Sequence, residues 1–88
     1  MVWLEDIVDK LRWKHQVVEG EVIEVLENHP RFVLKEAGFT PGEDVIGAFG
    51  RTARGRPLAV FFIYTRDQRA IIVSARDMSS KEKKRYDT

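Results

Sequence analysis

Cysteine is absent from this sequence of 88 residues, and long apolar runs are absent as well. Without cysteine the chain can form neither a disulfide scaffold nor a thiolate metal site, which suits a reducing compartment. The longest apolar run, Leu58 to Tyr64, is too short to cross a bilayer, and the N-terminus does not have the basic-then-apolar order of a secretion signal. We therefore expect a cytoplasmic protein with no membrane partner.

A large excess of either charge is also lacking, because the formal net charge is +1. This total hides an asymmetry between the two halves of the chain. Residues 1–49 carry a net charge of −5, whereas residues 50–88 carry +6. A basic half favours either a polyanion or an acidic protein segment as the partner. The length predicts a single domain, residues 1–88.

Apolar residues at steps of three and four predict two helices in the first third of the chain. The first helix would have its apolar face formed by Leu4, Ile7, Val8 and Leu11, with His15 at the end of that face. The second pattern consists of Val18, Val22, Ile23 and Leu26. It should end before Pro30, because a proline disfavours the helical conformation in the residue before it.

Strand-like runs follow the predicted helices. Residues 31–35 suggest a short strand, a turn-rich connection follows, and three runs then come in close order at 45–52, 57–65 and 70–76. Connections this short indicate an antiparallel meander, and the run 57–65 should be central because it is apolar on both faces. The predicted fold class is α+β: two N-terminal helices, an antiparallel sheet of three or four strands, and a short C-terminal helix.

The last strand and the last helix carry the most informative pattern. Ile72, Ser74 and Arg76 alternate and are expected on one face of the strand. Ser79 and Glu82 have the spacing of a capping box that begins a helix. An arginine on a mostly apolar strand costs desolvation unless it is paired, so Arg76 is either in a structural ion pair or in a site. Arg51, on what we take to be the neighbouring strand, is expected close to Arg76.

Residues 50–87 resemble the C-terminal half of the BrnT family, the ribonuclease toxins of bacterial type II toxin-antitoxin systems, whose fold is related to the RelE toxins. The resemblance rests on an Arg-Ile-Ile-Ser-Ala-Arg strand followed by a helix with a Glu and then a Tyr. The matching residues here are Ile72, Val73, Ser74, Ala75, Arg76, Glu82 and Tyr86. A weaker likeness covers residues 12–26. The chain departs from the family at Gln16, where a glycine is usual, and at Val45, where the family arginine is absent.

The resemblance implies metal-independent RNA cleavage, which needs a base for the 2′-hydroxyl, a cation for the phosphate and an acid for the leaving 5′ oxygen. The candidate catalytic residues are Arg76, His15, Glu82 and Tyr86. The candidate RNA-binding residues are Lys14, Arg51, Arg54, Arg56, Lys81, Lys84 and Arg85. No metal and no cofactor is implied. The implied partners are RNA and a cognate DNA-binding antitoxin (BrnA-like), with a homo-oligomer only inside a toxin-antitoxin complex.

Simpler interpretations stay open for most of these residues. His15 can be a structural or partner-contact histidine, and Glu82 is already explained by the capping box. The cations of residues 81–85 can be a solvated face, and Arg54 and Arg56 are expected exposed at a hairpin turn. Trp3 and Trp13 are expected to be core or interface anchors. Two other functions stay open: a non-catalytic RNA- or protein-binding module of the same fold, and a structural partner of a transcription regulator.

Overall fold

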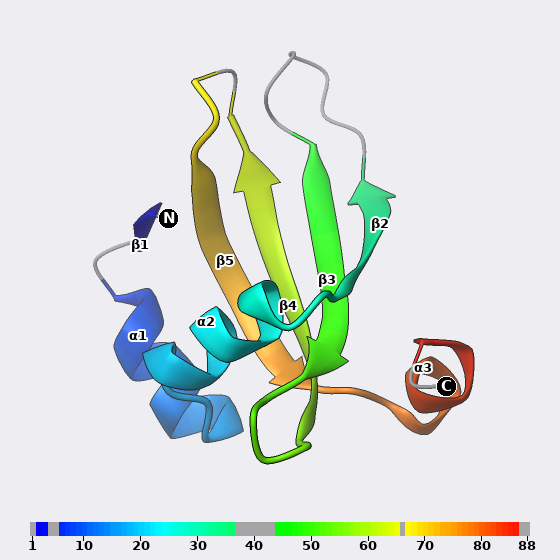
Figure 1. Ribbon diagram of the computed structural model, residues 1–88. Coiled ribbons are helices and arrows are strands. Elements are labelled where there is room, and N and C mark those ends of the chain that lie inside the picture. The colour runs from blue at the N-terminus through cyan, green and yellow to red at the C-terminus, as the bar shows by residue number, and fades with distance from the viewer. Residues whose placement is uncertain (1, 4–5, 37–43, 66, 87–88) are drawn as a thin grey trace.

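The computed structural model describes residues 2–3, 6–36, 44–65 and 67–86 (Figure 1). Leu4 and most of the turn-rich connection after the first predicted strand therefore lie outside the described residues. The elements are β1 (Val2–Trp3), α1 (Ile7–Lys10), the π-helical turn η1 (Leu11–His15), α2 (Glu19–Glu27), β2 (Arg31–Glu36), β3 (Val45–Arg51), β4 (Pro57–Tyr64), β5 (Ala70–Asp77) and α3 (Ser80–Tyr86).

The strands form one sheet with the order β1-β5-β4-β3-β2. Strands β2 to β5 pair with their chain neighbours in antiparallel fashion, so the predicted α+β fold with a meander is confirmed, and β4 is central as expected. The additional strand β1 pairs in parallel with β5, through Val2 opposite Ile71 and Trp3 opposite Ile72. Two residues are too short to show an alternating pattern, which is why the sequence does not predict β1.

The first predicted helix is only partly regular. It runs as an α-helix from Ile7 to Lys10 and then widens into a π-helical turn, in which the Gln16 backbone amide donates to the Leu11 carbonyl oxygen. The Val17 backbone amide donates to the same oxygen at 3.0 Å. The segment ends at Gln16 in a left-handed conformation, with φ of 56°. Leu11 and Val17 are buried, whereas Trp13 is 90% exposed. Trp13 is therefore not a core residue, so that half of the expectation is wrong. The alternative, that Trp13 anchors an interface, stays a prediction.

Helix α2 ends at Glu27, just before the Asn28-His29-Pro30 segment, as the sequence predicts. Its buried face differs from the predicted one. Val22 and Val25 are fully buried, whereas Val18 and Ile23 are 40% and 36% exposed. Val25 was not in the predicted apolar set, and its burial shows that the contact face is rotated away from Val18 and Ile23.

Two apolar clusters lie on opposite faces of the sheet. The larger one joins the N-terminal helices to the sheet and contains Leu11, Val17, Val22, Val25, Ala48, Leu58, Val60, Phe62, Ile72 and Ala75. The smaller one lies under α3, with buried Phe49, Ala59 and Met78 packed against Val33, Phe61 and Tyr86. Figure 1 shows α1 and α2 together beside the sheet and α3 apart from them. Each fully buried large aliphatic side chain contributes about 1.5–3 kcal/mol.

A bulge in β5 changes the faces of that strand. Phe61 pairs with Ser74 and Phe62 pairs with Ile72, so Val73 is the extra residue. Ile72 and Ala75 are therefore both in the larger cluster, and the predicted sharing of one face by Ile72 and Arg76 is wrong. Ser74 and Arg76 still share the opposite face, because no irregularity separates them. Within the described residues, no helix has both the length and the apolar composition needed to cross a membrane.

Candidate functional site

Arg76 and Glu82 form a two-pronged ion pair at the beginning of α3. Arg76 Nη1 and Nη2 donate to the two Glu82 carboxylate oxygens at 2.6 and 2.9 Å. The Ser79 backbone amide donates to Glu82 Oε1 at 2.8 Å, and the Glu82 amide donates to Ser79 Oγ at 3.2 Å, which confirms the capping box. The Arg76 guanidinium lowers the pKa of Glu82 to about 2, and Glu82 in turn raises the pKa of Arg76. Glu82 is therefore ionised at neutral pH.

Three aromatic rings continue from Arg76 across this face of the sheet. The Arg76 guanidinium carbon lies 5.2 Å from the centroid of the Phe61 ring. Phe61 packs edge-to-face on Phe49 at 6.1 Å, and Phe49 stacks on Tyr86 at 4.2 Å with an angle of 22° between the rings. Gly47 makes room for this arrangement, because a Cβ at its position would lie 2.8 Å from Phe49 Cε2. Glu82 and Tyr86 thus both face the sheet, as their spacing predicts.

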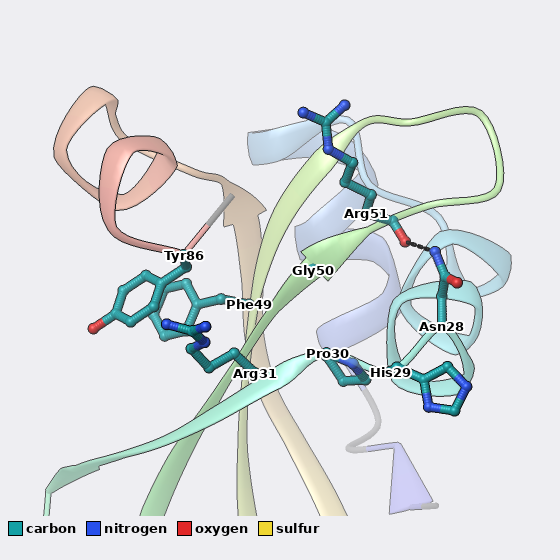
Figure 2. Close-up of a pocket in the computed structure, with 8 residues that line it drawn as sticks. All are labelled: Asn28, His29, Pro30, Arg31, Phe49, Gly50, Arg51 and Tyr86. Atoms are coloured by element: carbon teal, nitrogen blue, oxygen red, sulfur yellow. Dashed lines mark hydrogen bonds between the residues drawn. The ribbon is translucent and has the colours of Figure 1, made fainter. Parts of the chain in front are cut away.

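A cleft of about 520 Å³ opens beside the Phe49–Tyr86 stack (Figure 2). Its lining comes from the end of α2, the beginning of β2, the end of β3 and the last residue of α3. The lining residues are Asn28, His29, Pro30, Arg31, Phe49, Gly50, Arg51 and Tyr86. Figure 2 shows the Arg31 side chain running toward the aromatic pair and the Tyr86 hydroxyl directed outward. The lining residues thus include two arginines, a histidine, an asparagine and a tyrosine, and in Figure 2 the Arg51 side chain and the His29 ring point away from Tyr86.

Backbone geometry fixes the shape of the cleft. Asn28 Nδ2 donates to the Arg51 carbonyl oxygen at 3.2 Å and so ties the end of α2 to the end of β3. His29 has a φ of 48°, a left-handed conformation that turns the chain from α2 into β2. Gly50 allows Pro30 to lie close to β3, since a Cβ on Gly50 would be 3.1 Å from Pro30 Cβ. The Asn28-His29-Pro30 segment is therefore held against the sheet.

Arg56 has a structural role, in that it joins several segments of the chain, which the sequence did not indicate. Its Nε donates to Asp77 Oδ1 at 2.8 Å, and its Nη1 lies 3.0 Å from Glu21 Oε2. The same guanidinium donates to the carbonyl oxygens of Gln16 and His15, at 2.8 and 3.1 Å. Its side chain is 28% exposed, so the expectation of an exposed hairpin-tip arginine is wrong for Arg56. The ion pair with Asp77 raises the pKa of Arg56 and lowers that of Asp77.

The predicted catalytic residues fall into two groups on opposite faces of the sheet. Arg76, Glu82 and Tyr86 come together on the α3 face. His15 belongs to η1 on the other face of the sheet. The structure therefore brings three of the four together and leaves His15 apart.

The predicted RNA-binding residues are more scattered. Arg51 lines the cleft, and its Nη1 donates to the Gly55 carbonyl oxygen at 3.1 Å. The expectation that Arg51 and Arg76 lie on neighbouring strands is wrong, because β4 lies between their strands β3 and β5. Arg54 is exposed beside α2. Lys14 is exposed in η1. The remaining ones, Lys81, Lys84 and Arg85, are exposed on α3.

Sequence reasoning missed three residues that line the cleft: Asn28, His29 and Arg31. They stand next to one another around Pro30, where the chain leaves α2 and enters β2. A histidine and an arginine flanking a helix-ending proline were the available signal. By itself that signal predicts the end of a helix and the beginning of a strand.

Among the described residues, no group of three or more His, Asp or Glu side chains is placed to hold a metal ion. Comparison with protein-family models finds no match for the chain, and comparison with curated proteins finds none either. The fold and the geometry of the two faces are therefore the observations on which a function can be argued.

Proposed function

We propose that this chain is a metal-independent ribonuclease toxin of a bacterial toxin-antitoxin system, which binds RNA along the cleft and α3 and is neutralised by a DNA-binding antitoxin. One observation carries the proposal: Arg31, Arg51 and Tyr86 surround one cleft, and Arg76 adjoins it through the aromatic rings. The residue resemblance from Gly50 onward agrees with it, and so does the α+β meander.

The chemistry of the cleft suits a phosphodiester. Arginine can donate two parallel hydrogen bonds to phosphate oxygens and keeps its charge at any physiological pH. The half-buried Tyr86 ring, stacked on Phe49, adds an aromatic surface at the cleft, and stacking of a base on an aromatic ring is worth about 1–3 kcal/mol per base. Exposed Lys81, Lys84 and Arg85 on α3 extend the positive surface beyond the cleft. RNA binding here would weaken as salt concentration rises.

His29 is the best candidate for proton transfer in this cleft. In metal-independent cleavage the 2′ oxygen attacks phosphorus while a base accepts its proton, and the bond to the 5′ oxygen breaks as an acid protonates that oxygen. Glu82 suits neither part well, because a carboxyl group with a pKa of about 2 is a weak base and is not protonated at neutral pH. His29 lines the cleft and is exposed to solvent, whereas His15 lies on the other face. The proposal therefore replaces His15 with His29 as the group that moves protons.

A second candidate function is an RNA-binding module without cleavage. The observation that favours it is the ion pair of Arg76 with Glu82, which accounts for both residues as supports of α3. In that case, the phosphate would meet only Arg31, Arg51 and the α3 cations. Binding with a strong salt dependence and no cleavage is the sign of this function.

The test is cleavage of a mixed-sequence RNA by the purified protein in the presence of a metal chelator. The native protein should cleave, and His29→Gln should reduce the rate about a hundredfold, within the range that general acid-base catalysis contributes, while leaving RNA affinity nearly unchanged. Arg31→Gln should weaken affinity and lower its salt dependence by about one phosphate contact. Lys10→Gln removes an exposed cation of α1 outside the cleft and is the matched control.

The outcomes separate the two functions. Cleavage that survives in His29→Gln would remove His29 from the mechanism. Folded native protein that binds RNA and leaves it intact would favour the binding module. Folded native protein that neither binds nor cleaves RNA would overturn both.

A further inference from the structure

Strand β2 is the last strand of the sheet, and among the described residues no strand pairs with its outer side. From Arg31 to Leu34 its side chains alternate in chemistry as well as in direction, and Lys35 is the extra residue of a bulge against β3. Phe32 and Leu34 lie on the face of α1 and α2, with 58% and 60% of each residue exposed. Arg31 and Lys35 are exposed on the α3 face, where Lys35 Nζ lies 5.4 Å from the centroid of the Phe49 ring. The edge is therefore apolar on one face and cationic on the other.

The apolar side of this edge continues into a groove. Phe32 packs edge-to-face on Phe62, with centroids 6.1 Å apart. A hollow of about 400 Å³ follows, lined by Phe32, Phe62, Tyr64, Ile46, Ala70 and, from α2, Leu26. Tyr64 is 46% exposed. An unpaired strand edge presents backbone N–H and C=O groups that can pair with another chain. An exposed apolar surface beside such an edge is typical of a site where another protein docks.

We propose that β2 is a docking edge for an extended acidic segment of another protein, which adds a strand to the sheet. The added strand would alternate apolar residues facing Phe32 and Leu34 with Asp or Glu facing Arg31 and Lys35. Backbone hydrogen bonds along β2 would supply affinity, and the alternation would supply specificity. The two cations on one face select an acidic strand over a neutral one, since opposite charges directly across strands stabilise pairing.

A second copy of this chain fits the edge less well. In a symmetric antiparallel pair of β2 strands centred on Val33, Arg31 of one copy lies opposite Lys35 of the other. Like charges in that position destabilise pairing. The proposal stands on β2 and its groove, and it does not depend on RNA binding or cleavage.

The experiment uses a synthetic peptide of about 12 residues, the length of two short strands, in which Glu alternates with Val and Thr. The two control peptides are a scrambled isomer and a version with Lys in place of every Glu. Binding is measured by fluorescence anisotropy, and the contacted strand is located by hydrogen exchange of the backbone amides. The acidic peptide should bind the native protein and slow exchange in residues 31–36. The scrambled and Lys peptides should not.

Two variants test the two faces separately. Arg31→Glu with Lys35→Glu should lower the affinity for the acidic peptide about tenfold or more, because two attractive cross-strand charge pairs become repulsive. The same double variant should bind the Lys peptide, because its two new carboxylates attract lysine. Phe32→Thr with Leu34→Thr keeps strand propensity and should weaken both pairings. Ile23→Thr changes an exposed apolar residue of α2 that does not line the groove, and as the control it should change neither.

Three results would overturn the proposal. The first is no binding of the acidic peptide to folded native protein. The second is binding that is unchanged by charge reversal or that protects amides outside β2. The third is concentration-dependent self-association in sedimentation that Phe32→Thr with Leu34→Thr abolishes, because the occupant of the edge would then be a second copy of the chain.

Discussion

The ion pair of Arg76 with Glu82 should make the attachment of α3 sensitive to acid. Glu82 is held with a pKa of about 2, against an ordinary value of 4.5. The stabilisation that this provides is fully present above pH 4.5 and is lost as pH falls toward 2, because protonation removes the carboxylate from the pair. The pKa difference corresponds to about 3 kcal/mol. Because Arg76 is 36% exposed and partly screened, we expect about 1–2 kcal/mol in practice.

The assay is urea unfolding followed by circular dichroism, at pH values between 7 and 2, for the native protein and Glu82→Gln. At pH 7 the variant should be about 1–2 kcal/mol less stable, since it loses the ionic half of the pair. The two free energies of unfolding should converge near pH 2. The lowered pKa of Asp77 acts in both proteins and cancels in their difference.

Glu27→Gln serves as the matched control, because it neutralises an exposed carboxylate of α2. It should leave the pH dependence of the native protein unchanged. Stability curves of native protein and Glu82→Gln that stay parallel between pH 5 and pH 2 would refute the reasoning. They would mean that the pair does not stabilise the folded chain.

Four other substitutions test the packing that supports the two faces. Arg56→Gln should cost about 2–3 kcal/mol in urea unfolding, because two carboxylates lose their shared cation, and a loss under 0.5 kcal/mol would contradict its clamping part. Gly47→Ala should displace the Phe49 ring, lower the near-ultraviolet circular dichroism signal and cost about 1–3 kcal/mol. Tyr86→Leu should cost about 1 kcal/mol through loss of the ring stack, and an unchanged midpoint would show that the stack adds nothing. Trp13→Ser should change stability by less than about 0.5 kcal/mol, since that residue is 90% exposed, and a larger loss would imply an unseen contact.

Local signals in the sequence predicted the parts of the site that depend on short-range interactions. The capping box at Ser79 and Glu82 joins residues three apart, and the resulting helix delivers Glu82 and Tyr86 to one side. The pairing of Arg76 was anticipated as one of two alternatives, because a charge on an apolar strand needs a partner. These features follow from neighbours along the chain.

Features that depend on distant contacts were not predictable in the same way. The bulge at Val73 arises from how β5 pairs with β4, and a single residue there moves Ala75 to the opposite face. Arg56 meets Glu21 across 35 residues of chain. The cleft likewise requires the end of α2, β3 and α3 to converge, so no single segment announces it.

The ion pair with Glu82 does not use all the hydrogen-bond donors of Arg76. A guanidinium group carries five N–H donors, and in the described structure three hydrogen bonds account for Arg76: two to Glu82 and one to the Asp77 carbonyl oxygen. A phosphate oxygen can therefore approach the remaining edge of the guanidinium without displacing Glu82, and the 36% exposure of Arg76 allows that approach. Under the proposed function, the ion pair would orient the arginine and would not compete with RNA. It follows that Arg76 is compatible with both the ribonuclease and the binding module, and that His29 is the residue whose removal distinguishes them.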